Sequence, residues 1–352
     1  MRVRILQRLA ALGLMGALCL SVAGCATGPT KMENTIFAMD TVMTLTFYGA
    51  DPEAALQGPM DSLVSTVYEL QNALSATDEN SEIYALDHGN GGAVSLSPST
   101  AELLQSALDL CETTGGALDV TAYPAVKAWG FTTGDYRVPE PSELGELASR
   151  IDSTLVELNV ENASARLPEG MELDLGAVAK GYLGDRLADQ LRDINIQSAL
   201  LDLGQSSIQA VGSKPDGSPW RIGIQDPAGE GYLGVLELAD EAMGTSGGYQ
   251  RFFEAEGVRY WHIIDPDTAA PARSGLASVT VVSPSGFLCD GLSTALFVMG
   301  LEEGADFWRT HPELDFDAIF ISDDGSIHLT PGLEESFSLA TGYEDREVTI
   351  LT

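Results

Sequence analysis

The order in which strand-like and helix-like segments follow one another limits the fold of this chain more than any other feature. After residue 197 come seven short stretches rich in strand-forming residues, with no helix-length segment among them. A doubly wound parallel sheet needs helical crossovers between its strands, so this run disfavours that architecture. It favours an α+β fold of mostly antiparallel sheets with flanking helices. The predicted strands of the run are 198–203, 206–211, 219–224, 233–238, 251–254, 258–264 and 276–283.

Helical periodicity lies mainly outside this run. The chain has 352 residues, of which 44% are apolar, so it can form one large or two modest domains. Residues 34–48 predict a strand pair or one long strand, and 315–321 with 326–329 predict a hairpin that completes the core. The predicted helices are 51–76, 99–114, 176–196, 289–299 and 301–310, with a short one inside 135–150.

The N-terminus has the composition of a targeting segment. Three arginines precede an apolar stretch that is too short for a stable membrane span, which predicts a signal peptide over 1–24. Val22-Ala23-Gly24-Cys25 resembles a bacterial lipobox, in which Cys25 would be lipidated. An ordinary signal peptide with an incidental cysteine is the alternative. We expect a lipidated tether over 25–33, a globular region over 34–352, and a location at the cell envelope facing the periplasm or the exterior.

The charge balance narrows the choice of partners. The formal net charge is −34, and removal of 1–24, which holds three arginines and no acidic residue, makes it −37. A chain this acidic is repelled by nucleic acids and by anionic lipid headgroups, so membrane attachment must come from the lipid. Cys111 and Cys289 would remain after processing, and we expect both to be buried free thiols.

The segment Asp174–Asp185, DLGAVAKGYLGD, has features of a phosphate site. Asp174 precedes a helix that should begin near Ala177, and helix N-termini favour anions. Lys180 and Gly181 lie in its first turn, where the ammonium group could reach a phosphate. The segment is not a Walker A loop, because that motif places its lysine after the second glycine and follows it with Ser or Thr.

Asp290 and Thr294 could form a second site. They are four residues apart on a predicted helix, so a carboxylate and a hydroxyl share one face, which suits a hard cation such as Mg²⁺. Spacing alone favours the structural alternative, in which Asp290 caps the helix and Thr294 bonds to a carbonyl. His262, on a predicted strand, is a general base, an orienting group or a structural residue. The four histidines show no zinc-like spacing.

Two further stretches could face a ligand. Exposed N–H groups of the loop Gly244–Gln250, GTSGGYQ, could hold an anion or a ligand edge. The stretch ALDVTAYPAVKAWGF combines Asp119 with the rings of Tyr123 and Trp129. These rings face a planar ligand or belong to the core.

Taken in order, the motifs resemble a known family. They are MDTVMTL, GGALDVTAYPAVKAWGF, DLGAVAKGYLGDRL, SALLDLG, IGIQDP, TSGGYQRFF, HIIDPDTAAPA and SVTVVSPSGFLCDGLSTALFVMG. Over roughly residues 34–330 the chain resembles the FAD:protein FMN transferases of the ApbE type. The resemblance implies two interleaved lobes with the FAD site between them.

The resemblance also implies a reaction. Members transfer FMN from FAD to a Thr or Ser of a target protein and release AMP, with Mg²⁺ as cofactor. The targets are subunits of membrane redox complexes such as Na⁺-pumping quinone reductases or Rnf-type systems. Two alternatives stay open, namely a Mg²⁺-dependent FAD pyrophosphatase that yields FMN and AMP, and a non-catalytic flavin-binding lipoprotein.

Site residues follow from the resemblance. The implied metal ligands are Asp290, Thr294 and the carbonyl of Ala177. The implied catalytic residues are Asp290, Lys180 and His262, the last as the base for the acceptor hydroxyl or a group that orients it. The implied contacts to FAD are Met39, Asp119, Tyr123, Trp129, Asp174, Lys180, Gly181, Asp185, Ser246, Gly247, His262 and Asp265. Asp40, Gln205 and Gly248 stand where the family commonly has other residues.

Overall fold

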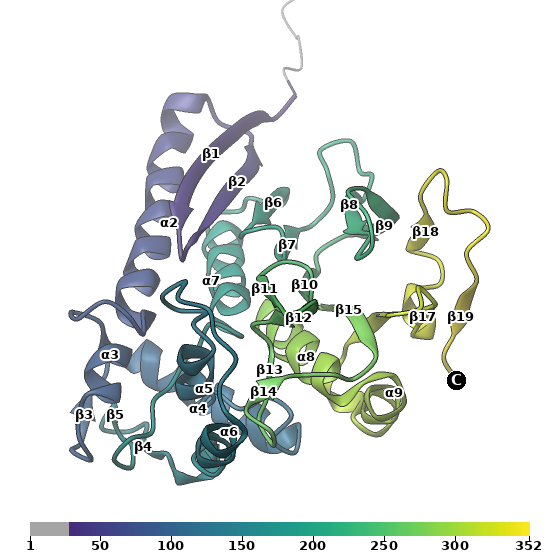
Figure 1. The fold of residues 1–352 in the computed structure, drawn as a ribbon. Helices are drawn as coiled ribbons and strands as arrows, with labels where there is room; N and C mark the ends of the chain where they lie inside the picture. Colours follow the sequence, from purple (N-terminus) through teal and green to yellow (C-terminus); the bar gives the residue numbers. More distant parts are fainter. Residues whose placement is uncertain (1–27) are drawn as a thin grey trace, which may run out of the picture.

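The computed structural model describes residues 28–352 (Figure 1). The predicted signal peptide and Cys25 lie outside this range. In the described range no helix is both long and apolar enough to cross a membrane.

A nine-stranded sheet forms the centre of the molecule. Its strand order is β1-β2-β6-β7-β10-β15-β16-β17-β19, and every neighbouring pair is antiparallel except β17 with β19. This confirms the predicted class of mostly antiparallel α+β fold. The strands are β1 (Thr30–Ala38), β2 (Thr41–Gly49), β6 (Ala199–Asp202), β7 (Ser207–Val211), β10 (Ala242–Gly247), β15 (Leu276–Ser283), β16 (Asp317–Ser322), β17 (Ile327–Leu329) and β19 (Val348–Ile350).

The sheet opens with a hairpin rather than one long strand. β1 and β2 pair along their whole length, and the two-residue turn is formed by Met39 and Asp40. Both turn residues have positive φ, 47° and 58°. That backbone matches the right-handed twist of paired strands, as in a type I′ turn. The helix α2 (Glu53–Leu74) lies along this hairpin (Figure 1).

Two helices cover the middle of the sheet. α7 (Ala179–Asp193) packs on β7, and α8 (Gly286–Met299) packs on β10 and β15. The two helices touch at Gly181 and Gly286, where a Cβ atom on Gly181 would lie 1.9 Å from the carbonyl oxygen of Gly286. Only hydrogen atoms fit between the backbones here. The glycine predicted for a phosphate loop therefore allows close helix packing.

The other elements surround this centre. A three-stranded sheet, β18-β9-β8, packs on the strands from β7 to β17 through its own hydrophobic cluster. A third cluster contains Trp129, Phe131 and Ile264. The elements not yet given are α3 (Glu82–Asp87), β3 (Val94–Ser95), α4 (Pro98–Thr113), α5 (Tyr123–Ala128), α6 (Pro141–Ala148), β4 (Glu157–Asn159), β5 (Ser164–Arg166), β8 (Trp220–Gln225), β9 (Tyr232–Leu238), β11 (Phe252–Ala255), β12 (Val258–Trp261), β13 (Ile264–Asp265), β14 (Ala270–Pro271), α9 (Leu301–Thr310) and β18 (Phe337–Leu339).

Three sequence predictions need correction. The predicted strand 258–264 is broken into β12 and β13, with His262 between them. The predicted hairpin does not complete the core, because β18 joins the small sheet and β19 joins the central one. Both strands have three residues, too few for a periodic signal. The helix predicted over 176–196 begins at Ala179.

Candidate active site

Asp290 lies in the second turn of α8 and is buried, with 7% of its surface exposed. Its Oδ2 accepts a hydrogen bond from the Gly181 N–H at 2.7 Å, and its Oδ1 accepts one from the Ser207 hydroxyl at 2.7 Å. The helix is instead capped by Ser285, so the alternative that Asp290 serves as the cap is wrong. Burial raises the pKa of Asp290, and the nearby Lys180 lowers it. Among residues 28–352 no cationic nitrogen lies within 4 Å of this carboxylate.

The turn that leads into α7 leaves one carbonyl unpaired. In a regular α-helix the Gly181 N–H would bond to the Ala177 carbonyl, four residues earlier. Here that N–H donates to Asp290, and no hydrogen bond in the described part of the chain ends on the Ala177 oxygen. This diversion also explains why α7 begins later than predicted. A carbonyl with no partner and a buried carboxylate form a donor set suited to a hard cation.

Thr294 completes a set of hard oxygen donors. Its hydroxyl lies one turn beyond Asp290 on α8 and is 3.1 Å from the hydroxyl of Ser246, at the end of β10. Ser246 is also 3.0 Å from the hydroxyl of Ser293. The Thr294 hydroxyl and the Asp290 carbonyl are 3.4 Å apart, which is a weak version of the predicted back-bond. Spacing alone favoured the structural role, because the neighbours that favour the other role come from distant parts of the chain, including β10.

Positive charge gathers next to these oxygens. Lys180 and Arg251 both lower the pKa of Asp174, which burial raises. In the described residues neither cation has a carboxylate oxygen within 4 Å. The Lys180 N–H also donates to no protein acceptor there. An ammonium, a guanidinium and a free helix N–H in an acidic protein form an anion site.

His262 lies directly after β12, within reach of the same charges. Its Nδ1 is buried without a hydrogen-bond partner. Burial, together with the charges of Arg251 and Lys180, lowers the pKa of His262 to about 4. The imidazole is therefore neutral at pH 7 and can accept a proton, as a general base must.

The hairpin turn stands against the loop that follows β6. Gly204 has φ 112°, and a Cβ atom there would lie 2.6 Å from the Thr41 side chain. Asp202 holds the loop, since its Oδ1 accepts from the N–H groups of Gly204 and Gln205 at 3.0 and 2.7 Å. The Met39 N–H donates to Gln71 on α2 at 2.7 Å. Met39 is thus fixed in place, while its contact with a flavin stays a prediction.

Several predicted contacts have other partners in this structure. Asp185 accepts from the N–H groups of Gly286 and Phe287 at 2.6 and 2.9 Å, and so helps to cap α8. Asp119 accepts from Thr121 in its own loop and from the N–H of Ser153, 34 residues further along the chain. Asp265 accepts from the Asp267 N–H in the turn after β13. The predicted contacts of these carboxylates with FAD remain predictions, and any such contact must coexist with these bonds.

The two aromatic candidates are core residues. Trp129 is 2% exposed and its indole N–H donates to the Ala269 carbonyl at 2.8 Å. Tyr123 is 5% exposed, and burial raises its pKa to about 12. This geometry is that of core packing, which was the alternative for both rings. Their contact with a flavin stays a prediction.

Sequence reasoning missed two neighbours of the site. Ser207 begins a strand and bonds Asp290, and Arg251 follows the GTSGGYQ loop. A serine at a strand start and an arginine in a polar stretch carry no signal of their own. Both acquire meaning only when the sheet brings β7 and β10 beneath α8.

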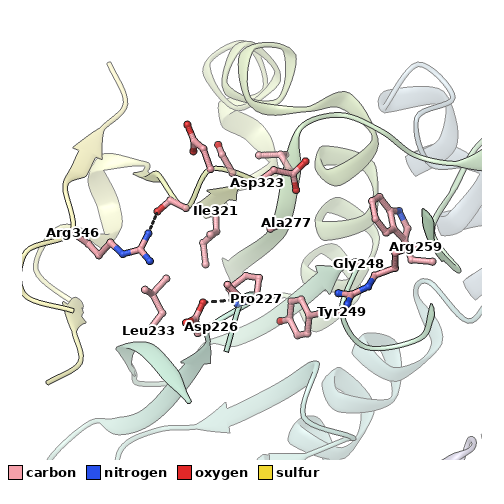
Figure 2. A pocket seen from close by; sticks show the side chains of 16 residues that line it. Asp226, Pro227, Leu233, Gly248, Tyr249, Arg259, Ala277, Ile321, Asp323 and Arg346 are labelled. Atoms are coloured by element: carbon pink, nitrogen blue, oxygen red, sulfur yellow. Dashed lines mark hydrogen bonds between the residues drawn. The ribbon is translucent and has the colours of Figure 1, made fainter. Parts of the chain in front are cut away.

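A cavity of about 260 Å³ is lined in part by the end of the GTSGGYQ loop (Figure 2). Its walls include Gly248 and Tyr249, which follow Gly247 in the chain, and Trp261, which directly precedes His262. Asp290, Thr294 and Lys180 do not line it. The cavity therefore adjoins the candidate site without containing its charged centre.

The site as a whole combines hard oxygen donors, two unpaired cations and a neutral imidazole. Such a set can bind a polyphosphate and assist attack at phosphorus, because developing charge on the phosphate oxygens is met by fixed positive groups. Groups of three or more His, Cys, Asp or Glu arranged to hold a metal are absent from residues 28–352. A metal here would depend on one carboxylate, with carbonyl, hydroxyl, water and phosphate oxygens as the other ligands.

Comparison with known proteins gives a consistent result. A model of the ApbE family matches residues 39–320. The FAD:protein FMN transferase of Treponema pallidum (strain Nichols) is 32% identical over 342 residues, which covers 92% of this chain and 93% of that protein. The FAD:protein FMN transferase of Vibrio cholerae serotype O1 is 34% identical over 295 residues, covering 81% and 86%.

Solved structures agree in fold. The crystal structure of the ApbE protein from Thermotoga maritima superposes with a TM-score of 0.81 at 27% identity, covering 87% of this chain and 99% of that one. The flavin transferase ApbE from Vibrio cholerae gives a TM-score of 0.77 at 28% identity, covering 88% and 99%.

Proposed function

We propose, from the premise that this chain belongs to the ApbE family, that it is a Mg²⁺-dependent FAD:protein FMN transferase. It is a transferase that uses FAD and modifies a protein acceptor. The acceptor residue is a Thr or Ser, and AMP is the leaving group. The acceptor is a subunit of a membrane redox complex, such as a Na⁺-pumping quinone reductase or an Rnf-type system, and the enzyme is held at the envelope surface by a lipid on Cys25.

The turn that leads into α7 is the strongest support. The buried Asp290 carboxylate and the Thr294 hydroxyl come from α8, and the unpaired Ala177 carbonyl comes from the turn before α7, the helix that touches α8 at a glycine pair. A buried carboxylate without a countercharge is costly, and a divalent cation would supply that charge. These three groups would hold Mg²⁺. Bound there, the ion would neutralise the charge that develops on the pyrophosphate.

The protein's own groups have the following roles. Lys180 and Arg251 bind the pyrophosphate, and Ser246 helps to place Thr294. The oxygen of the acceptor hydroxyl forms a bond to the FMN-side phosphorus, while the bond from that phosphorus to the bridging oxygen breaks and AMP departs. The hydroxyl proton goes to His262, which is neutral at pH 7 because of its lowered pKa.

The test is transfer itself. The purified protein is incubated with FAD, MgCl₂ and a purified candidate acceptor, and flavin fluorescence is then read on a denaturing gel. We expect a fluorescent acceptor band and one AMP per flavin attached. Release of FMN and AMP without any labelled acceptor would identify a pyrophosphatase instead. Binding of FAD with no AMP under any condition would identify a non-catalytic flavin-binding protein.

A further inference from the structure

The β11–β12 hairpin carries His262 at its base. It forms a two-stranded sheet that pairs with no other strand of the described chain. The His262 N–H donates to the Arg251 carbonyl at 3.1 Å and closes the hairpin beside the reaction centre. Its turn, Glu256-Gly257, has positive φ at both residues, 51° and 78°, which again matches the twist of a tight hairpin. Anything that docks on this hairpin therefore lies next to the candidate base.

One face of the hairpin is fixed to the protein. Residues paired across two antiparallel strands share a face, so Phe253 and Tyr260 lie together. Their rings are 6.3 and 5.1 Å from the ring of Trp129, centroid to centroid. The opposite face carries the two remaining pairs with large side chains. They are Phe252 with Trp261 and Glu254 with Arg259.

Two ordered guanidinium groups lie at this hairpin: Arg259 is on the opposite face, and Arg273 lies beside β12, where it approaches the rings of both Trp261 and Tyr260. The guanidinium carbon of Arg273 is 4.1 Å from the ring centroid of Trp261, and its Nη2 donates to the Arg259 carbonyl. The guanidinium of Arg259 lies 4.1 Å from the ring centroid of Phe252. Stacking and the backbone bond hold Arg273 in one orientation although the residue is exposed, so little entropy is lost when it binds an anion.

The charges around this face distinguish the two arginines. Arg259 already has a partner, because its guanidinium is 3.2 Å from Glu254. Arg273 has no carboxylate oxygen within 4 Å among residues 28–352. Most of the chain repels anions, because its formal net charge is −34. An exposed, oriented and unpaired guanidinium over Trp261, the residue before His262, is therefore a local exception that favours an acidic partner.

The neighbouring cavity limits where an acidic side chain can go. Arg259 and Tyr249 lie on one side of it and Leu233 and Arg346 on the other, as Figure 2 shows. Its walls also carry the carboxylates of Asp226, Asp323 and Asp324. These three carboxylates outnumber the guanidinium groups of Arg259 and Arg346 on the same walls, so the cavity is a less favourable place for an acidic side chain than Arg273, which does not line it.

We propose that the acceptor protein docks beside strand β12 of the hairpin, where Arg273 binds a carboxylate a few residues from the acceptor hydroxyl. The proposal rests on the proposed function. It assigns to Arg273 a role in choosing the acceptor and none in binding FAD.

Synthetic peptides test this without knowledge of the natural acceptor. The probe is a set of fluorescein-labelled peptides with one central Thr in a Gly/Ala/Ser background. Two Asp residues are placed at successive positions on either side of it, and matched peptides carry Asn or Lys at the same positions. Affinity is measured by fluorescence polarisation on the full chain with FAD and MgCl₂, and flavin transfer is measured in parallel. The variants are Arg273→Gln, Arg273→Lys and, as a matched control, the exposed β8 arginine in Arg221→Gln.

For at least one placement of the Asp residues, the wild type should bind the Asp peptide about tenfold more tightly than the matching Asn peptide. The Asn peptide has no carboxylate, so its complex lacks the charge-assisted hydrogen bond to Arg273. Arg273→Gln should abolish that preference, Arg273→Lys should keep part of it, and Arg221→Gln should keep all of it. The KM for FAD, measured with the Asn peptide as acceptor, should be unchanged in all three variants.

Three results would overturn the proposal. They are equal binding of Asp and Asn peptides at every position, a raised KM for FAD in Arg273→Gln, and an Asp preference that survives this variant. Binding of the wild type to vesicles with 30% anionic lipid, lost in Arg273→Gln, would assign the surface to the membrane instead. Because flavin transfer to the Asn peptides needs no contact between Arg273 and a carboxylate, failure of the docking proposal is distinguishable from failure of the proposed function.

Discussion

Replacement of Gly181 by alanine should loosen the contact between α7 and α8. The new Cβ atom would lie 1.9 Å from the carbonyl oxygen of Gly286, and backbone atoms cannot rotate away. To restore a separation of about 3.0 Å the helices must move apart by about 1.1 Å, which gives up much of their packing energy. The same shift strains the 2.7 Å bond from the Gly181 N–H to Asp290. Overpacking of about 1–3 kcal/mol and a weakened buried hydrogen bond of about 1 kcal/mol together give a loss of about 2–4 kcal/mol.

Thermal unfolding followed by circular dichroism measures this loss. For a chain of this size, about 2 °C in Tm corresponds to 1 kcal/mol, so Gly181→Ala should unfold about 4–8 °C earlier than the wild type. Gly58→Ala is the matched control, because Gly58 lies inside α2 with open space around its Cα. Alanine there should leave Tm unchanged or raise it slightly. A Gly181→Ala protein as stable as this control would refute the close contact and, with it, the way the site is held together.

Three further outcomes follow from the site. Asp185→Ala removes part of the α8 cap, so it should lower the free energy of unfolding in urea by about 1–2 kcal/mol and leave the KM for FAD constant. Unchanged stability with a raised KM for FAD would favour the nucleotide contact instead. Because the pKa of His262 is about 4 rather than the ordinary 6.5, the unfolded chain takes up a proton first as pH falls. The free energy of unfolding of the wild type should therefore fall relative to that of His262→Gln between pH 6.5 and 4. Urea titrations of both proteins at pH 7 and 5 measure this, and a difference between the two proteins that is the same at both pH values would contradict it. Lys180→Ala should raise the KM for FAD about tenfold with an unchanged fold, and an unaltered KM would remove Lys180 from the phosphate site.

The helices and the antiparallel class were predictable because their signals are local. The periodic apolar positions of 51–76 predict α2, and the strand run after residue 197 predicts the sheet class. Strands of two or three residues, such as β13 and β18, were not predictable, because their pairing depends on partners elsewhere in the chain.

The candidate site was only partly visible in the sequence. Spacing alone favoured a structural role for Asp290, and the metal role came from the family resemblance. The structure supplies a physical reason that no sequence window contains. The Gly181 N–H, 109 residues away along the chain, bonds to Asp290 and leaves the Ala177 carbonyl unpaired. Ser207 and Arg251 went unrecognised for the same reason, since their roles depend on tertiary neighbours.

The central claim is that Asp290, Thr294 and the Ala177 carbonyl hold the Mg²⁺ that FAD cleavage requires. A titration of MgCl₂ at fixed FAD and acceptor, with AMP and protein-bound flavin quantified together, tests it most directly on the wild type and Asp290→Asn. Asparagine is suitable because it keeps the shape of the side chain and can still bond to Gly181 and Ser207. The account predicts saturable, equimolar AMP and bound flavin for the wild type and neither product for a folded Asp290→Asn protein at any Mg²⁺ concentration. Products formed by the wild type in the presence of a chelator, or by Asp290→Asn with the wild-type dependence on Mg²⁺, would contradict it.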